Sequence, residues 1–174
     1  MKLLVLDLDG VINNDLDSEY HNVYHVSPNG NISEKLFFSK SCVNLINDIT
    51  TRTGAVILLS STWRLGETVE SAQRMLSSMG LTGKVIGLTE NLTYSKRIPD
   101  DVARVIPRGV EVHKWIVENE TTLGYEGYFT EYVILDDDDD FLISMLPNFV
   151  QCDSNIGITR ELADKAISIL KVAM

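Results

Sequence analysis

Short, nearly continuous runs of apolar residues alternate along the chain with longer segments in which apolar positions recur every three or four residues. Continuous apolar runs of this length are typical of strands that are buried on both faces of a sheet. The runs lie at residues 3–8, 55–60, 84–88, 132–135 and 148–152. The sequence therefore predicts five buried strands.

Four other segments have the spacing of amphipathic helices, with apolar side chains on one face. They lie at residues 41–51, 67–79 and 109–119, and from Thr159 to Leu170. Thr159 is suited to cap the last helix. Strands that alternate with helices predict an α/β fold with a parallel sheet, right-handed crossovers and helices on both faces.

Two segments without clear periodicity, residues 13–39 and 89–107, each follow a predicted strand. The first contains the turn sequence Pro28-Asn29-Gly30. Neither segment is long enough for a substantial second domain. We therefore expect one domain over residues 1–174, with residues 13–39 as a flap or small cap insertion.

Composition and charge limit the classes of partner. The net charge of −10 argues against a broad binding surface for nucleic acid or an anionic membrane, although a local basic pocket is compatible with it. No apolar stretch approaches the about 18 residues of a membrane span. Cys42 and Cys152 are expected to be free thiols in a reducing compartment. We expect a cytoplasmic protein.

The first predicted strand ends in two aspartates, Asp7 and Asp9, which are followed by Gly10. Burying a carboxylate costs free energy unless a partner compensates for it. At the carboxyl end of a parallel strand, both side chains would face the crevice where such sheets bind ligands. Clustered carboxylates suit Mg²⁺, and one of them can attack phosphorus as a nucleophile. The alternative is a turn with polar ends.

Two further predicted strands end in polar residues. Ser60 and Ser61 follow one strand, with Arg64 close behind, and Asp136 and Asp137 follow the other. Carboxylates, hydroxyls and an arginine at one edge of a sheet fit phosphoryl transfer. The alternatives are a helix cap at the serines and a solvated acidic run at the aspartates.

Other residues of these segments are assigned to structural roles. Trp63 is expected in the core, and Asp138 and Asp139 are expected to be solvated. The three histidines have no metal-ligand spacing and are expected to be satisfied or exposed: His21, His25 and His113.

Taken in order, Asp7-Leu8-Asp9-Gly10, Ser60 and Asp136-Asp137 resemble the motifs of the haloacid dehalogenase (HAD) superfamily. The resemblance covers residues 3–170. The segments 59–64, 85–89 and 108–116 are more closely similar to the HAD domain of bacterial and phage "Swiss army knife" RNA repair proteins. The resemblance implies a three-layer Rossmannoid fold with a minimal cap or none.

The resemblance also implies roles for the residues at the strand ends. Asp7 corresponds to the nucleophile that forms an aspartyl-phosphate. Asp9 corresponds to the general acid and base, and its backbone carbonyl to a Mg²⁺ ligand. Ser60 corresponds to the residue that binds the phosphoryl group, and Asp136 and Asp137 to the remaining metal ligands.

Several further positions stay open. Asp140 gives an alternative spacing for the metal ligand, which the superfamily also uses. The superfamily has a basic residue before its fourth strand. Arg108 fits this position best, and Arg97 and Lys114 are the other candidates. Arg64 is suited to clamp a phosphate or sugar, because a guanidinium offers bidentate geometry. Ser61, Arg64, Arg97 and Lys114 are therefore the candidate substrate contacts.

We accordingly expect a Mg²⁺-dependent phosphatase that releases phosphate from monoesters. A site without a lid admits bulky substrates, and the resemblance implies terminal phosphates of RNA, DNA or nucleotides, as in a polynucleotide 3'-phosphatase. The acidic charge argues for few contacts to a nucleic acid. A soluble nucleotidase or small-molecule phosphatase and a catalytically idle binding module are the alternatives.

Overall fold

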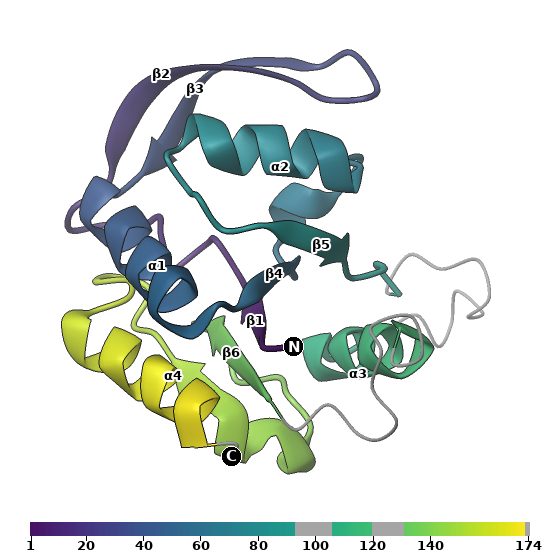
Figure 1. Ribbon diagram of the computed structural model, residues 1–174. Coiled ribbons are helices and arrows are strands. Elements are labelled where there is room, and N and C mark those ends of the chain that lie inside the picture. The colour runs from purple at the N-terminus through teal and green to yellow at the C-terminus, as the bar shows by residue number, and fades with distance from the viewer. Residues whose placement is uncertain (93–105, 120–130, 173–174) are drawn as a thin grey trace.

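A computed structural model of the chain describes residues 1–92, 106–119 and 131–172, and a five-stranded parallel sheet lies at its centre (Figure 1). The strand order is β5-β4-β1-β6-β7, and every neighbouring pair is parallel. The strands are β1 (Leu3–Leu6), β4 (Val56–Leu59), β5 (Val85–Leu88), β6 (Tyr132–Asp136) and β7 (Phe149–Gln151). All five predicted strands are confirmed, with ends that differ by no more than two residues.

Four α-helices and two short 3₁₀ helices surround this sheet in the described part of the chain. They are α1 (Lys40–Thr53), α2 (Val69–Ser78), α3 (Arg108–Asn119), α4 (Arg160–Val172), η1 (Thr62–Arg64) and η2 (Ile143–Asn148). The predicted cap of α4 is confirmed, because Thr159 Oγ1 accepts a hydrogen bond from the backbone N–H of Leu162 at 3.3 Å. The predicted α/β class is confirmed as well.

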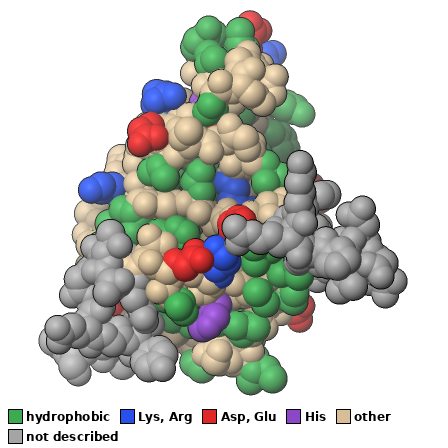
Figure 2. Space-filling view, turned by 90° about the vertical axis from the view of Figure 1, so that its right-hand side faces the viewer, with side chains coloured by type: hydrophobic (Ala, Val, Ile, Leu, Met, Phe, Trp, Pro, Cys, Tyr) green, Lys and Arg blue, Asp and Glu red, His purple; other side chains and the backbone are tan. Residues whose placement is uncertain are grey.

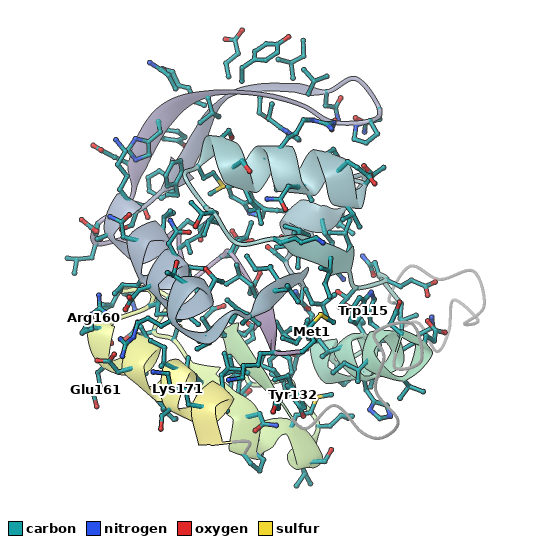
Figure 3. All side chains as sticks on the ribbon, in the orientation of Figure 1. Met1, Trp115, Tyr132, Arg160, Glu161 and Lys171 are labelled. Atoms are coloured by element: carbon teal, nitrogen blue, oxygen red, sulfur yellow. The ribbon has the colours of Figure 1, made fainter. Side chains whose placement is uncertain are left out.

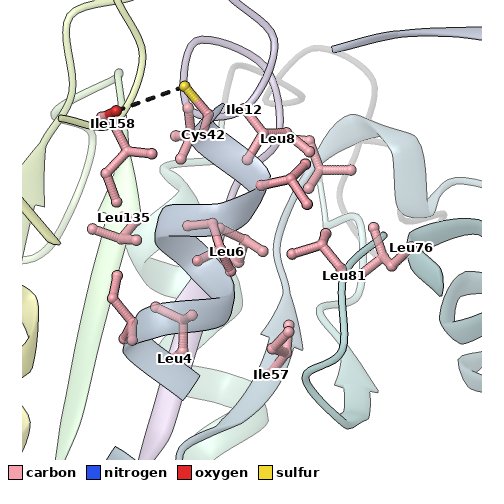
Figure 4. Packing of buried hydrophobic residues seen from close by; sticks show 14 of the residues in the cluster. Leu4, Leu6, Leu8, Ile12, Cys42, Ile57, Leu76, Leu81, Leu135 and Ile158 are labelled. Carbon is pink, nitrogen blue, oxygen red and sulfur yellow. Dashed lines mark hydrogen bonds between the residues drawn. The ribbon is translucent and has the colours of Figure 1, made fainter. Parts of the chain in front are cut away.

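Alternate side chains of β1 enter two separate hydrophobic clusters, which explains why its sequence is continuously apolar. Leu4 and Leu6 pack in the larger cluster with residues of α1, α2 and α4 (Figure 4). Leu3 and Val5 pack in the smaller cluster with residues of α3. The helices therefore cover both faces of the sheet, with α3 opposite the other three.

The segment between β1 and α1, in which a flap or small cap was expected, forms an antiparallel hairpin. Its strands are β2 (Glu19–Val26) and β3 (Ile32–Phe38), and the hairpin runs across α2 (Figure 1). The predicted turn is confirmed: Gly30 has a φ of +87°, and its N–H donates to Ser27 O at 2.9 Å. The strands themselves were not predicted, because a bulge between Asn22 and His25 interrupts their alternation.

Both cysteines are buried free thiols, as expected. The thiol of Cys42 lies 3.6 Å from Ile158 O, and this contact links the start of α1 to the segment before α4 (Figure 4). Within the described residues, no helix is long and apolar enough to cross a membrane.

Gly87 of β5 lies against Trp115 of α3. A Cβ atom at this position would lie 2.3 Å from Cζ2 of Trp115, which sits between α3 and the sheet (Figure 3). A side chain at residue 87 would therefore displace the indole ring and the helix that carries it.

We expect Gly87→Ala to lower the free energy of unfolding by about 1–3 kcal/mol, because it overpacks this contact. Urea unfolding measures the loss. The double variant Gly87→Ala/Trp115→Leu should lose less than the sum of the two single variants, since the smaller side chain leaves room for the new methyl group. Strictly additive losses would contradict a steric origin.

Candidate active site

The carboxyl ends of three adjacent strands bring the predicted site residues to one edge of the sheet. Leu6 of β1 pairs with Leu59 of β4 and with Leu135 of β6, so the residues that follow these positions lie at the same level. The N–H of Asp7 donates to Leu135 O at 3.0 Å, and the N–H of Ser60 donates to Leu6 O at 2.9 Å. The pairing register of β1 with β4 and β6 therefore brings the carboxyl ends of the three strands to the same level.

An acidic cluster occupies this edge. Asp7, Asp136 and Asp137 each present a carboxylate oxygen, and these oxygens lie within 4.8 Å of one another. Asp7 and Asp136 are buried, whereas Asp137 is half-buried. Gly10 makes room for the third member, because a Cβ on Gly10 would lie 2.3 Å from Asp137 Cγ. A residue with a side chain at position 10 would therefore clash with Asp137, which explains why glycine follows Asp9.

Burial and mutual repulsion favour protonation of these carboxyl groups. Burial raises the pKa of Asp136 to about 8, and the charge of Asp7 adds to the effect. Burial also raises the pKa of Asp7 to about 6, although a hydrogen bond from Ser61 and the charge of Arg108 oppose it. A cation within the cluster would stabilise the charged forms. Oxygen ligands of this kind fit Mg²⁺, so the residues suit the predicted metal.

Asp9 is not a member of this cluster, and three donors hold its carboxylate. Asn13 Nδ2 and Trp63 Nε1 donate to Oδ1 at 2.6 and 2.9 Å, and Thr62 Oγ1 donates to Oδ2 at 3.0 Å. Trp63 packs on the core as expected, but its indole N–H also orients Asp9, which the sequence analysis missed. The three bonds fix the Asp9 carboxylate in one orientation.

The two serines after β4 differ in what their hydroxyls contact. Ser61 hydrogen-bonds the Asp7 carboxylate and also caps η1. The Ser60 hydroxyl is fully buried and accepts a hydrogen bond from Thr89 Oγ1 at 3.4 Å. Consecutive side chains at a strand end point in different directions, so the two hydroxyls have different surroundings. Ser60, which we expected to bind the phosphoryl group, contacts Thr89, and Ser61 is the serine whose hydrogen bond lowers the pKa of Asp7.

Arg108 begins α3 and directs positive charge at the acidic cluster. Its charge lowers the pKa of both Asp7 and Asp136. Its Nη1 atom is buried without a hydrogen-bond partner among the described residues. A buried N–H donor without an acceptor is costly, so this nitrogen is suited to bind an anionic group.

Asp140, which was expected as an alternative metal ligand, contacts the start of α3. Its Oδ2 accepts a hydrogen bond from the backbone N–H of Arg108 at 2.9 Å, and its carbonyl oxygen accepts from Gly109 N at 3.1 Å. Asp140 therefore satisfies donors at the first turn of α3, where a carboxylate is favourable. Asp138 and Asp139 are exposed, as expected.

Arg64 is engaged within the protein instead of being free to clamp a substrate. Its Nε donates to Thr89 O, its Nη1 to Ser61 O and its Nη2 to Glu111 Oε2, each at 2.7 Å. The side chain is buried, and burial lowers the pKa of the guanidinium against the opposing charge of Glu111. Arg64 thereby ties the loop that carries Ser61 to α3.

Glu111 is a functional partner that the sequence analysis did not single out. Besides Arg64, it binds the N–H of Leu92 through Oε1 at 2.9 Å. The available signal was its position: Glu111 falls on the same helical stripe as Trp115, among the buried apolar residues of α3. A carboxylate on such a stripe requires a buried partner.

Lys114, another basic candidate, is engaged by glutamates outside the cluster. Lys114 forms ion pairs with Glu90 at 2.9 Å and Glu118 at 2.7 Å. Arg97 lies outside the described residues. On the face shown in Figure 2, the described part carries acidic and basic side chains side by side instead of a broad basic patch. Arg108 is therefore the candidate that the described structure brings to the aspartates.

These groups together present the Asp7 carboxylate, its acidic neighbours Asp136 and Asp137, and an Arg108 nitrogen that has no hydrogen-bond partner within the described residues. A family model described as "HAD domain in Swiss Army Knife RNA repair proteins" matches residues 3–163. No curated protein matches the chain. One similar solved structure is a HAD superfamily (subfamily III A) hydrolase from Legionella pneumophila, with 14% identity and a TM-score of 0.45 over 99% of this chain and 85% of that chain. Because the family model spans most of the sequence, the chain belongs to the family of HAD domains found in Swiss Army Knife RNA repair proteins.

Proposed function

We propose that this protein is a Mg²⁺-dependent phosphomonoesterase that uses Asp7 as its nucleophile and acts on terminal phosphates of nucleic acid or nucleotides. The observation that carries the proposal is the placement of the Asp7 carboxylate against Asp136 and Asp137, with the charge of Arg108 acting on it. Membership of a HAD family supports a hydrolase.

The reaction proceeds in two displacements at phosphorus. In the first, an Asp7 oxygen attacks phosphorus, the bond to the leaving oxygen breaks, and Asp9 gives that oxygen a proton. In the second, water attacks the aspartyl-phosphate, Asp9 accepts the proton of the water, and Asp7 is released. Bound Mg²⁺ would neutralise charge on the phosphoryl oxygens.

The contacts of Asp9 assign its two oxygens different tasks. Oδ1 accepts from Asn13 and Trp63, which keeps it an acceptor. Oδ2 meets the hydroxyl of Thr62, which can rotate to donate or accept a hydrogen bond. Oδ2 is therefore the oxygen that carries the proton between the two displacements. Ser61 and the unpartnered Nη1 of Arg108 bind the phosphoryl oxygens.

Terminal phosphates of RNA or DNA are the proposed substrates because the matching family model is that of RNA repair proteins. An enzyme that binds only an end needs few basic contacts, which agrees with a net charge of −10. The same charge favours the second candidate, a nucleotidase or small-molecule phosphatase. Comparing turnover of 3'- or 5'-phosphorylated oligonucleotides with that of mononucleotides distinguishes them.

Asp7→Asn should reduce phosphate release from an aryl phosphate by at least about a thousandfold, because the amide is not a nucleophile. The protein should stay folded, since the substitution removes one of the crowded charges. A malachite green phosphate assay and circular dichroism measure the two effects. Asp139→Asn, at an exposed position of the same acidic run, is the matched control and should retain activity. Equal turnover in both variants would refute the covalent mechanism.

Arg108→Ala should lower kcat/KM by about 100- to 1000-fold, the usual effect of removing one donor to the developing charge. Arg108→Lys should recover part of the loss. Lys114→Ala is the control, because Lys114 already pairs with two glutamates at the surface. If Lys114→Ala lost the activity and Arg108→Ala kept it, the assignment of the basic residue would be reversed.

Without Mg²⁺, the free energy of unfolding should fall as the pH rises from about 4 to about 8. The folded-state pKa of Asp136 is about 8 and that of Asp7 about 6, both above the ordinary value of 3.8, so the folded protein binds more protons than the unfolded chain in this interval. Urea unfolding at several pH values measures the slope.

Saturating Mg²⁺ should reduce this loss of stability, because bound cation stabilises the charged carboxylates. Asp136→Asn should flatten the metal-free pH dependence. A chelator should stop turnover completely. A pH dependence that Mg²⁺ leaves unchanged, or full activity in excess chelator, would exclude a cation at this cluster.

A further inference from the structure

A cavity of about 360 Å³ lies between the β2–β3 hairpin and the loop that follows β4. The hairpin contributes His25, Asn31 and Ser33 to its wall, and the loop contributes Trp63 and Glu67. The mechanism proposed above uses none of the hairpin residues. The cavity is therefore a separate feature whose ligand can be inferred from its own chemistry.

Glu67 supplies an unsatisfied acceptor in this cavity. Its side chain is only 6% exposed, and its Oε1 lies 3.0 Å from His25 Nε2. Its Oε2 is buried and has no hydrogen-bond partner among the described residues. Leaving a buried carboxylate oxygen without a donor is costly. A ligand in the cavity that brought an O–H or N–H group to Glu67 would satisfy this oxygen.

The cavity adjoins Asp9 through two shared residues. Thr62 and Trp63 both line the cavity, and both hydrogen-bond the Asp9 carboxylate. In the proposed mechanism, Asp9 protonates the leaving oxygen of the phosphoester. A group bound in the cavity would therefore lie next to the residue that must reach the leaving oxygen.

The residues that line the cavity determine which charge and shape of leaving group can bind there. The only titratable side chains in the wall are His25 and Glu67, and no lysine or arginine is among the described residues that line it. A second phosphate there would meet a carboxylate with no compensating cation. Trp63, Leu36 and Met75 offer apolar surface, which suits the face of a ring. The wall thus fits a neutral ring that carries hydrogen-bond donors.

We propose that this cavity is a leaving-group subsite that binds a nucleoside, which donates a hydrogen bond to Glu67 Oε2 and packs a ring on Trp63. The proposal rests on the proposed function in that it identifies the group to which the scissile phosphate is attached. It predicts that the terminal nucleoside, and not the rest of a polynucleotide chain, supplies most of the binding to this part of the protein.

The test is calorimetric titration of the full chain with the four ribonucleosides, which carry no phosphate and undergo no reaction. Ribose and ribose 5-phosphate are titrated alongside, so that binding of the sugar is separated from binding of the base. Glu67→Gln removes the charge of the acceptor, and Ser33→Phe fills the cavity from the hairpin side. Glu34→Gln is the matched control, since it makes the same change at an exposed position of β3.

We expect at least one nucleoside to bind more tightly than ribose, and ribose 5-phosphate to bind more weakly still. Both Glu67→Gln and Ser33→Phe should weaken nucleoside binding about fivefold or more, which corresponds to about 1 kcal/mol, while Glu34→Gln should match the wild type. Circular dichroism checks that each variant is folded. Absence of nucleoside binding, or equal binding by all four proteins, would overturn the subsite.

Phosphate release from an aryl phosphate is measured on the same samples and reports the proposed function separately. If the aryl phosphate is hydrolysed and nucleosides do not bind, the subsite is wrong and the phosphatase stands. If nucleosides bind with the expected loss in the variants and no phosphoester is hydrolysed, the cavity is a nucleoside site, but the phosphatase and the leaving-group role of the cavity both fail.

Discussion

The need to compensate buried negative charge is the constraint on which the rest of this structure depends. Parallel pairing of β1 with β4 and β6 brings Asp7 and Asp136 to the same level of one sheet edge, and Asp137 joins them over Gly10. No arrangement of apolar residues can stabilise three carboxylates at this spacing. The groups around them, from Ser61 to the start of α3, are accordingly those that donate hydrogen bonds or carry positive charge.

Two arginines, Arg108 and Arg64, bring positive charge to this edge of the sheet, and their side chains make different contacts. The charge of Arg108 acts on the aspartates, and one of its nitrogens has no partner in the part of the chain that the structure describes. Arg64 instead donates hydrogen bonds to Thr89, Ser61 and Glu111. A buried arginine that is fully engaged by protein groups positions them; one with a spare donor can bind a ligand. The contrast explains why two arginines beside one site are not interchangeable.

The sheet could be predicted from the sequence because strands buried on both faces need continuous apolar runs, and Asp7 and Asp136 were found because each follows such a run. The hairpin was missed, since a half-exposed strand with a bulge has no regular alternation. Tertiary partners such as Glu111 for Arg64 could not be read from local sequence, and neither could the difference between Ser60 and its neighbour. These depend on where a side chain points after the chain has folded.

The acidic run after β6 joins two parts of the site that seem independent. Its first two residues, Asp136 and Asp137, belong to the carboxylate cluster, and its last, Asp140, binds the backbone at the start of the helix that carries Arg108. Five consecutive residues thus set the position of the negative groups and of the positive group that opposes them. An insertion or deletion within this run would shift both at once, so the length of the run, as much as its charge, fixes the electric field at the carboxylate cluster.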